Sequence, residues 1–406
     1  MWLLLILFFI SLLFGQLIRI PLFGGAALYS HDIVLGVIVM YWIIKKCVLG
    51  KNSVLIVKKK LTLFFPLKLF LAAMLLSLAV NMSNHTLPEI GEALGYVMRF
   101  IFYASLYPII ATEENKKQWL IWLYGIGVVY ALLGFLQYAL YPNLRNLMYL
   151  GWDPHYYRLF STFLDPNFSG LFIILTFIIG IYLFHSGNRK RIILIFQEIL
   201  SLSLLLTLSR SSYVAFMTVL IVYGIMKRSY TMLVILLLFI GIILCVPFPG
   251  TDITKLFRTD SSAARIQNWS ESLALIQQKP LFGYGFNFLR TVRRESPLPT
   301  GSESNENGIE SPSTLSHSSG GLDNSFLFVF ATTGIVGFLA WIYLLCSMSK
   351  QGVVLLKRKN PMGETVILSL LSISIHSLFV NSFFYPWILI WLWSISGIVE
   401  QKEKEK

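Results

Sequence analysis

Long runs of apolar residues constrain the fold of this chain more than any other feature of its sequence. Each run is close to the roughly 20 residues that an α-helix needs to cross the hydrocarbon core of a bilayer. Hydrophobic residues make up 56% of the 406 residues and charged residues only 13%, whereas soluble domains carry about 25% charged residues. We therefore predict an all-α, polytopic membrane protein with about 12 transmembrane helices, near residues 2–22, 32–44, 61–80, 91–111, 119–141, 163–184, 192–208, 211–226, 230–248, 323–348, 365–382 and 384–400.

Lysine and arginine are distributed unevenly over the connections between these spans. One set of short connections holds only Arg19, Arg145, Arg158 and Arg210. The other set carries basic clusters, among them Lys58–Lys60, Arg189–Arg191 and Lys357–Lys359. Because basic residues are retained on the cytoplasmic side, both termini are predicted to be cytoplasmic. The same asymmetry accounts for the net charge of +13, so nucleic acid is not expected as a partner.

The pattern divides the chain into three parts. They are residues 1–248 with nine spans and short loops, residues 249–322 as one large extracytoplasmic loop, and residues 323–406 with three spans and a cytoplasmic tail. The two runs on either side of Ser209-Arg210 are short, so one long broken helix is an alternative to two spans there. Within the loop, Ser262–Gln278 is expected to form an amphipathic helix with Ile266, Trp269, Leu273 and Ile276 on one face.

Several residues of the spans have ordinary explanations. Trp119, Trp122, Trp387, Trp391 and Trp393 lie near span ends, as anchors at the membrane–water interface do. Gly334 and Gly337 are expected to allow close helix packing. The three cysteines form no CxxC pair, which indicates neither a disulfide framework nor a structural zinc site.

Four arginines converge on the outer side in this topology: Arg99, Arg158, Arg210 and Arg265. Arg99 lies inside a predicted span, where an unpaired cation costs at least ~2.5–3.5 kcal/mol, so it should face a partner or a watery cavity. Arginine suits phosphate because its planar fork donates two parallel hydrogen bonds while it stays charged. For each arginine taken singly, pairing with a carboxylate is an alternative. Asp32, at the outer end of the second span, is interpreted as a cap or turn residue.

Asp323 is the acidic residue of interest, because it lies where the long loop returns to the membrane. Its carboxylate could take a proton from an attacking hydroxyl group. Alternatively it is the N-cap of the helix that follows, for which both Asp323 and Asn324 are suitable. The six histidines show no metal-binding spacing, and no phosphate-binding loop precedes a helix. Neither a metal nor a nucleotide cofactor is therefore expected.

Six segments together resemble the superfamily of O-antigen ligases and O-antigen polymerases (Wzy type), which are bacterial membrane glycosyltransferases with a GT-C-like helical fold. The segments are Arg158-Leu-Phe-Ser-Thr-Phe-Leu-Asp-Pro-Asn167, Leu208-Ser-Arg-Ser-Ser-Tyr213, Arg265-Ile-Gln-Asn-Trp269 with Pro280-Leu-Phe-Gly-Tyr-Gly285, Asp323-Asn-Ser-Phe-Leu327, and Thr333-Gly-Ile-Val-Gly337. The resemblance covers residues 158–337. Outside this region the spans match only in hydropathy.

This resemblance implies glycan transfer from undecaprenyl diphosphate to an acceptor hydroxyl, without metal and with inversion at the anomeric carbon. It implies that Arg158, Arg210 and Arg265, with Arg99 as a further candidate, hold the diphosphate, and that Asn167, Asn324 and Trp269 line the substrate cavity. The family's His-Asn pair reads Asp323-Asn324 here, so Asp323 or the nearby His317 would activate the acceptor.

That departure favours a polysaccharide polymerase, which joins lipid-linked repeat units at the outer face of the bacterial cytoplasmic membrane. A ligase that moves a finished glycan to another acceptor is the alternative within the family. A flippase or other transporter of lipid-linked oligosaccharides is the alternative from another class. The expected partners are the lipid-linked oligosaccharide, a growing polysaccharide or other glycan acceptor and the lipid bilayer, and a chain-length regulator is a further candidate.

Overall fold

The computed structural model describes residues 2–22, 27–48, 61–150, 152–187, 189–245, 260–289 and 322–400. These residues are mostly helical, and the only strands among them form a small antiparallel hairpin, β1 (Arg19–Pro21) and β2 (Ala27–Tyr29). The α-helices are α1 (Trp2–Leu13), α2 (Ser30–Val48), α4 (Phe64–Asn81), α5 (Leu87–Ala104), α6 (Leu106–Thr112), α7 (Lys116–Leu140), α8 (Pro166–Ser186), α9 (Lys190–Leu206), α10 (Arg210–Lys227), α11 (Tyr230–Cys245), α12 (Asp260–Gln278), α14 (Ser325–Lys357), α15 (Met362–His376) and α16 (Pro386–Val399). Short 3₁₀ turns lie at Met82–Asn84, Arg145–Leu150, Ser161–Phe163 and Ser382–Phe384. The predicted helical class is thus confirmed for these residues, the hairpin aside.

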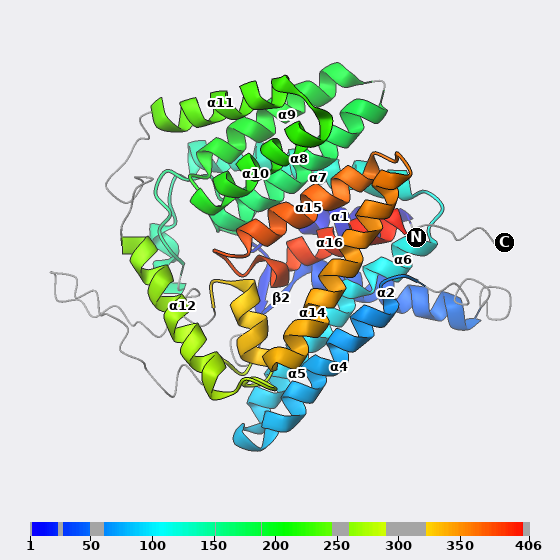
Figure 1. Ribbon diagram of the computed structural model, residues 1–406, viewed down its shortest axis with the longest axis vertical. Coiled ribbons are helices and arrows are strands. Elements are labelled where there is room, and N and C mark those ends of the chain that lie inside the picture. Colours follow the sequence, from blue (N-terminus) through cyan, green and yellow to red (C-terminus); the bar gives the residue numbers. More distant parts are fainter. Residues whose placement is uncertain are drawn as a thin grey trace.

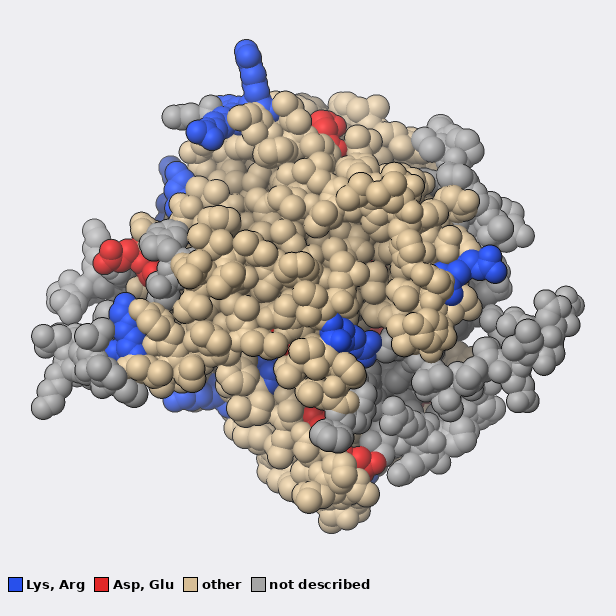
Figure 2. Space-filling model, turned by 180° about the vertical axis from the view of Figure 1, so that it is seen from behind, with Lys and Arg blue, Asp and Glu red and all other residues tan. Residues whose placement is uncertain are grey.

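The surface of this bundle is apolar, as a membrane protein requires. Five helical stretches are long and apolar enough to cross a membrane: Phe64–Asn84, Leu87–Thr112, Lys116–Leu140, Pro166–Ser186 and Ser325–Lys357. Large apolar side chains point outward, for example Leu237, Leu238 and Leu244 of α11, which are at least 60% exposed. Figure 2 shows a mostly uncharged face with charged side chains in a few separate groups. All twelve predicted ranges overlap helices, while the number of crossings remains a prediction.

The chain forms two helices on either side of Ser209, not one broken helix. Leu208 has a positive φ of 49°, and this left-handed residue turns the backbone between α9 and α10. The start of α10 contacts Asn167 at the start of α8, and its last residue, Lys227, lies beside His185 at the end of α8. Because α9 begins only four residues after the end of α8 and packs along it, α9 and α10 run in opposite directions.

Helix α16 is the centre of the bundle, and this corrects one expectation. Trp387, Trp391 and Trp393 are each 1% exposed, and Trp119 is 3% exposed, so these residues do not anchor the protein at a membrane interface. A helix that is apolar on all sides is suited to a central position. Accordingly α16 packs against α5, α6, α7 and α15.

Helix α14 is kinked at Gly334, where φ is 64° and ψ is −169°. The segment 280–285 fills the kink through four backbone hydrogen bonds, in which the donor N–H is named first: Tyr284 to Ala331 (3.0 Å), Gly285 to Thr332 (2.9 Å), Ile335 to Pro280 (2.9 Å) and Val336 to Leu281 (3.4 Å). A Cβ atom on Gly334 would lie 2.2 Å from the carbonyl oxygen of Leu281. Gly334 therefore admits a neighbouring loop, whereas we expected it to admit a neighbouring helix.

The helices define two ends of the bundle. The starts of α8, α10 and α14 and the end of α15 meet at one end, which we call the arginine end; α12 lies there, at the left of Figure 1. The opposite end, which we call the lysine end, holds the ends of α8 and α10 and the start of α15.

The buried Glu400 carboxylate also lies at the lysine end. It accepts hydrogen bonds from Thr62 Oγ1 (2.8 Å), Tyr107 OH (2.7 Å) and Gln351 Nε2 (2.7 Å).

Candidate functional site

Arg158 holds the end of α9 in place at the arginine end. Its Nε donates to the carbonyl of Thr207 at 2.9 Å, and its Nη2 donates to the carbonyl of Leu208 at 3.2 Å. The last carbonyls of a helix have no partner within the helix and carry partial negative charge, so a guanidinium group suits this position. Arg158 also interacts electrostatically with Asp165, whose side chain caps the start of α8.

Arg210 is the first residue of α10, and a serine-rich turn fixes its position. The side chain of Ser209 caps the helix by accepting from the N–H of Ser212. Ser209 Oγ donates to Asn167 Oδ1 at 2.9 Å, and Ser212 Oγ donates to the Asn167 carbonyl at 3.2 Å. Asn167, expected to line the cavity, thus joins the starts of α8 and α10.

Helix α12 has the expected position in the sequence but a partly different buried face. Ile266 and Leu273 are 67% and 52% exposed, whereas Ser272 is fully buried. The buried stripe follows the helical spacing and runs from Arg265 through Trp269 and Ser272 to Ile276. The predicted face is therefore correct for Trp269 and Ile276 and wrong for Ile266 and Leu273, which point away from the bundle.

Arg265 connects the charged groups of this end. It interacts electrostatically with Arg210, Asp323 and Asp165. Burial and the neighbouring Arg210 lower the pKa of the Arg265 guanidinium, while Asp323 and Asp165 raise it. Since the ordinary pKa of arginine is above 12, the group stays charged at neutral pH. Arg158, Arg210 and Arg265 thus share one charged cluster with Asp165 and Asp323, and Asp153 interacts with Asp165.

The start of α14 separates the roles of Asp323 and Asn324. The N-cap is Asn324, whose Oδ1 accepts from the N–H groups of Phe326 (2.8 Å) and Leu327 (3.2 Å). The interpretation of Asp323 as the cap is therefore wrong. Asp323 is half-buried one residue earlier and interacts with Arg265. His317, the other candidate base, lies outside the described residues.

Trp269 lies one turn after Arg265 on α12. The Phe379 ring is 6.0 Å from the Arg265 guanidinium carbon and 6.5 Å from the Trp269 ring. The indole N–H of Trp269 is buried and has no hydrogen-bond partner among the described residues. It is therefore an available donor next to the charged groups.

Arg99 belongs to a different cluster. Its Nη2 donates to Asp32 Oδ2 at 3.0 Å and also to the carbonyl of Ala27. Asp32 additionally accepts from the backbone N–H of Tyr29 at 2.9 Å, which confirms its role as a cap. An intramembrane carboxylate is therefore the partner that Arg99 required. The structure brings together Arg158, Arg210 and Arg265 and gives Arg99 a separate place beside the hairpin.

His376 was not singled out from the sequence. It ends α15 fully buried at the arginine end, within hydrogen-bond distance of serines from two elements. Its spacing to the other histidines matches no metal-binding motif. Its position inside the predicted span 365–382 could have identified it as a candidate, because titratable residues within spans are commonly functional.

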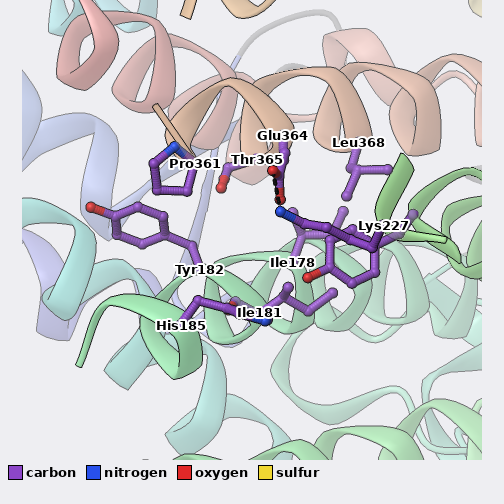
Figure 3. A pocket seen from close by; sticks show the side chains of 10 residues that line it. Ile178, Ile181, Tyr182, His185, Lys227, Pro361, Glu364, Thr365 and Leu368 are labelled. Carbon is purple, nitrogen blue, oxygen red and sulfur yellow. Dashed lines mark hydrogen bonds and ion pairs between the residues drawn. The ribbon is translucent and has the colours of Figure 1, made fainter. Parts of the chain in front are cut away.

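The lysine end contains a small cavity. A cavity of about 50 Å³ between α8, α10 and α15 is lined by aliphatic residues with His185, Tyr182 and Lys227 (Figure 3). Lys227 Nζ lies 2.5 Å from Glu364 Oε1, so the only cation lining this cavity is already paired. Nowhere in the described ranges do three or more His, Cys, Asp or Glu residues gather as metal ligands would. The arginine end is therefore the better candidate site.

An apolar helical bundle with five stretches long enough to cross a membrane, and with arginines at one end, is typical of a multi-pass membrane protein. Sequence comparison then gives the family. Residues 198–342 match the profile of the family Wzy_C, described as O-Antigen ligase. The matched region contains Arg210, Arg265 and Asp323, whereas Arg158 and His376 lie outside it. The resemblance stated from the sequence motifs is thereby confirmed.

A curated relative gives the same family name. The protein named "O-antigen ligase" from Salmonella typhimurium (strain LT2) is 26% identical over 256 residues. The aligned part is 60% of this chain and 59% of the relative. The chain thus matches well under two thirds of the relative's length.

Proposed function

We propose that the protein is a polysaccharide polymerase of the cytoplasmic membrane that uses undecaprenyl-diphosphate-linked oligosaccharide as donor and a sugar hydroxyl of a glycan as acceptor. The observation that carries the proposal is the electrostatic interaction between Arg210 and Arg265 at one end of an apolar bundle. Like charges repel each other, and a bound anion would lower the energy of keeping the two guanidinium groups in one site. A lipid diphosphate supplies such an anion together with an apolar tail that the surrounding bilayer accommodates.

The transfer step requires a leaving group and a base. The acceptor oxygen attacks the anomeric carbon as the bond from that carbon to the phosphate oxygen breaks. The electron pair leaves with the lipid diphosphate, where Arg210 and Arg265 stabilise the charge. The hydroxyl proton goes to Asp323, which lies beside Arg265. Attack opposite to the leaving group inverts the anomeric carbon.

Asp323 also decides between polymerase and ligase in this proposal. The family resemblance places histidine at this position in ligases, and this chain has aspartate. The Salmonella relative carries the name of a ligase, so transfer of a finished glycan to another acceptor is the second candidate. In both cases we place the arginine end outside the cytoplasm, because the basic connections lie at the lysine end.

One assay distinguishes the candidates. Purified protein in proteoliposomes is incubated with lipid-linked repeat units, and the products are separated on a gel. A ladder of products identifies a polymerase, and a single shift of an added acceptor identifies a ligase. Movement of the donor across the bilayer without any product would contradict both and support a flippase.

A further inference from the structure

The ring of His376 joins elements that are distant in the sequence. Its Nδ1 lies 2.6 Å from Ser382 Oγ, and its Nε2 lies 3.1 Å from Ser211 Oγ and 3.3 Å from Ser212 Oγ. Ser211 and Ser212 directly follow Arg210 in α10, whereas Ser382 lies in the turn between α15 and α16. All four side chains are at most 2% exposed, so water does not compete for these bonds.

The neighbouring hydrogen bonds define the protonation of the ring. Ser382 Oγ donates to the carbonyl of Val380 at 3.2 Å, so it can only accept from His376 Nδ1–H. Nε2 is then the acceptor. The hydroxyl of Ser211 lies within donating distance of Nε2, while Ser212 Oγ also has the Asn167 carbonyl and Ser209 Oγ as acceptors. A neutral imidazole thus suits these partners and adds no charge beside Arg265.

The turn after His376 contacts the start of α14 and Arg265. The carbonyl of Leu378 accepts from Asn324 Nδ2 at 3.0 Å, and the Ser377 carbonyl accepts from the N–H of Ser325 at 2.9 Å. The ring of Phe379 lies against Arg265. One imidazole is therefore hydrogen-bonded to the helix that presents Arg210, and its own turn contacts Arg265 and the start of α14 beside Asp323.

We propose that neutral His376 is a positioning residue that sets the separation of Arg210 and Arg265 by bridging the α10 serines to Ser382. This role rests on the proposed function of the two arginines and assigns no proton transfer to His376. Small errors in placement are costly, since a shift of about 1 Å at a reacting centre can reduce the rate ~100-fold.

Two conservative variants test the bridge. His376→Asn retains an amide near the position of Nδ1 and can reach Ser382, whereas His376→Gln extends to the position of Nε2 and can reach the α10 serines. Neither can bridge both sides. We expect each variant to have the wild-type apparent Tm within about 3 °C and to lose ~10–100-fold in turnover. His185→Gln and His185→Asn, at the lysine end, are the matched controls and should match the wild type.

A double-mutant cycle separates positioning from general support of the fold. In a protein that already carries Arg210→Lys, adding His376→Gln should lower turnover by less than about threefold. The effects of two substitutions are not additive when one residue acts through the other. The affinity of the His376 variants for undecaprenyl diphosphate, measured as the rise in Tm on adding this ligand, should fall in parallel with turnover. Wild-type turnover in both His376 variants, or fully additive losses, would overturn the bridge while leaving the proposed function intact. A wild-type protein that neither binds the diphosphate nor forms product would overturn the proposed function, and the bridge with it.

Discussion

Arginine and lysine carry the same charge, but only arginine can donate two parallel hydrogen bonds to a phosphate group. If Arg210 and Arg265 bind a diphosphate, Lys variants should be impaired and Ala variants nearly inactive. Loss of each donor group should cost ~2–4 kcal/mol of transition-state stabilisation, which is ~10²–10³-fold in kcat. The measurement is product formation at equal protein abundance, with Arg145→Ala as an exposed arginine control. Wild-type turnover in either Ala variant would remove that arginine from the site.

Asp323 can be tested without disturbing the helix, because Asn324 is the cap of α14. Asp323→Asn and Asp323→Ser should fold as the wild type and lose ~10²–10⁴-fold in rate, the usual contribution of a general base. Asp323→His should recover part of the activity. Asn324→Ala is the contrasting variant, since loss of a cap should lower stability by about 1 kcal/mol. An active Asp323→Asn variant would contradict the assignment of Asp323 as the general base, and His317 would then be the candidate for that role.

At the scale of single residues, the sequence was informative about residue type and poor about partners. Arg210, Arg265 and Asp323 were identified because charge is rare in this chain. Asp323 and Asn324 are adjacent and both cap helices well, so sequence alone could not choose between them. His376 escaped notice because its partners are serines 164 to 165 residues away and 6 residues away, a pattern that belongs to no motif.

Among the elements, the kink of α14 gives the sharpest prediction. Gly334→Ala places a Cβ atom 2.2 Å from the Leu281 carbonyl oxygen in a left-handed backbone conformation. Overpacking alone typically costs 1–3 kcal/mol, so we expect a clear loss of apparent Tm in detergent, by about 5 °C or more. Gly125→Ala and Gly241→Ala are matched controls, because nothing lies within 4 Å of the added atom. A Gly334→Ala variant as stable as these controls would contradict the account of the kink.

The positions of the helices in the chain were predicted better than their boundaries or surroundings: the predicted span 2–22 includes strand β1, and α14 continues to Lys357. Apolar run length locates a helix in the chain because a membrane span needs a fixed length. It does not reveal which side of a helix meets protein and which meets lipid, since both environments are apolar. This is why Ile266 and Leu273 of α12 were assigned to the wrong face and why the α16 tryptophans were taken for interfacial anchors.

For the whole molecule, the charge asymmetry predicts the orientation in the membrane. Tyr149 and Tyr230 are 73% and 86% exposed and lie at opposite ends of the bundle. In a background without the three native cysteines, Tyr149→Cys should react with a membrane-impermeant maleimide applied from outside. Tyr230→Cys should react only after permeabilisation. Labelling of both positions from outside would contradict the topology and the placement of the site.

The Glu400 carboxylate at the lysine end has a consequence for the order in which the protein is assembled. Thr62 and Tyr107 precede their shared partner by 338 and 293 residues. At ~5–20 residues per second, a ribosome needs roughly 20 to 70 seconds to add the residues between Thr62 and Glu400. Through that interval the hydroxyl groups of the early helices must use other acceptors. The final cross-links between the first and last helices form only when translation has passed Glu400, so this end of the bundle closes last.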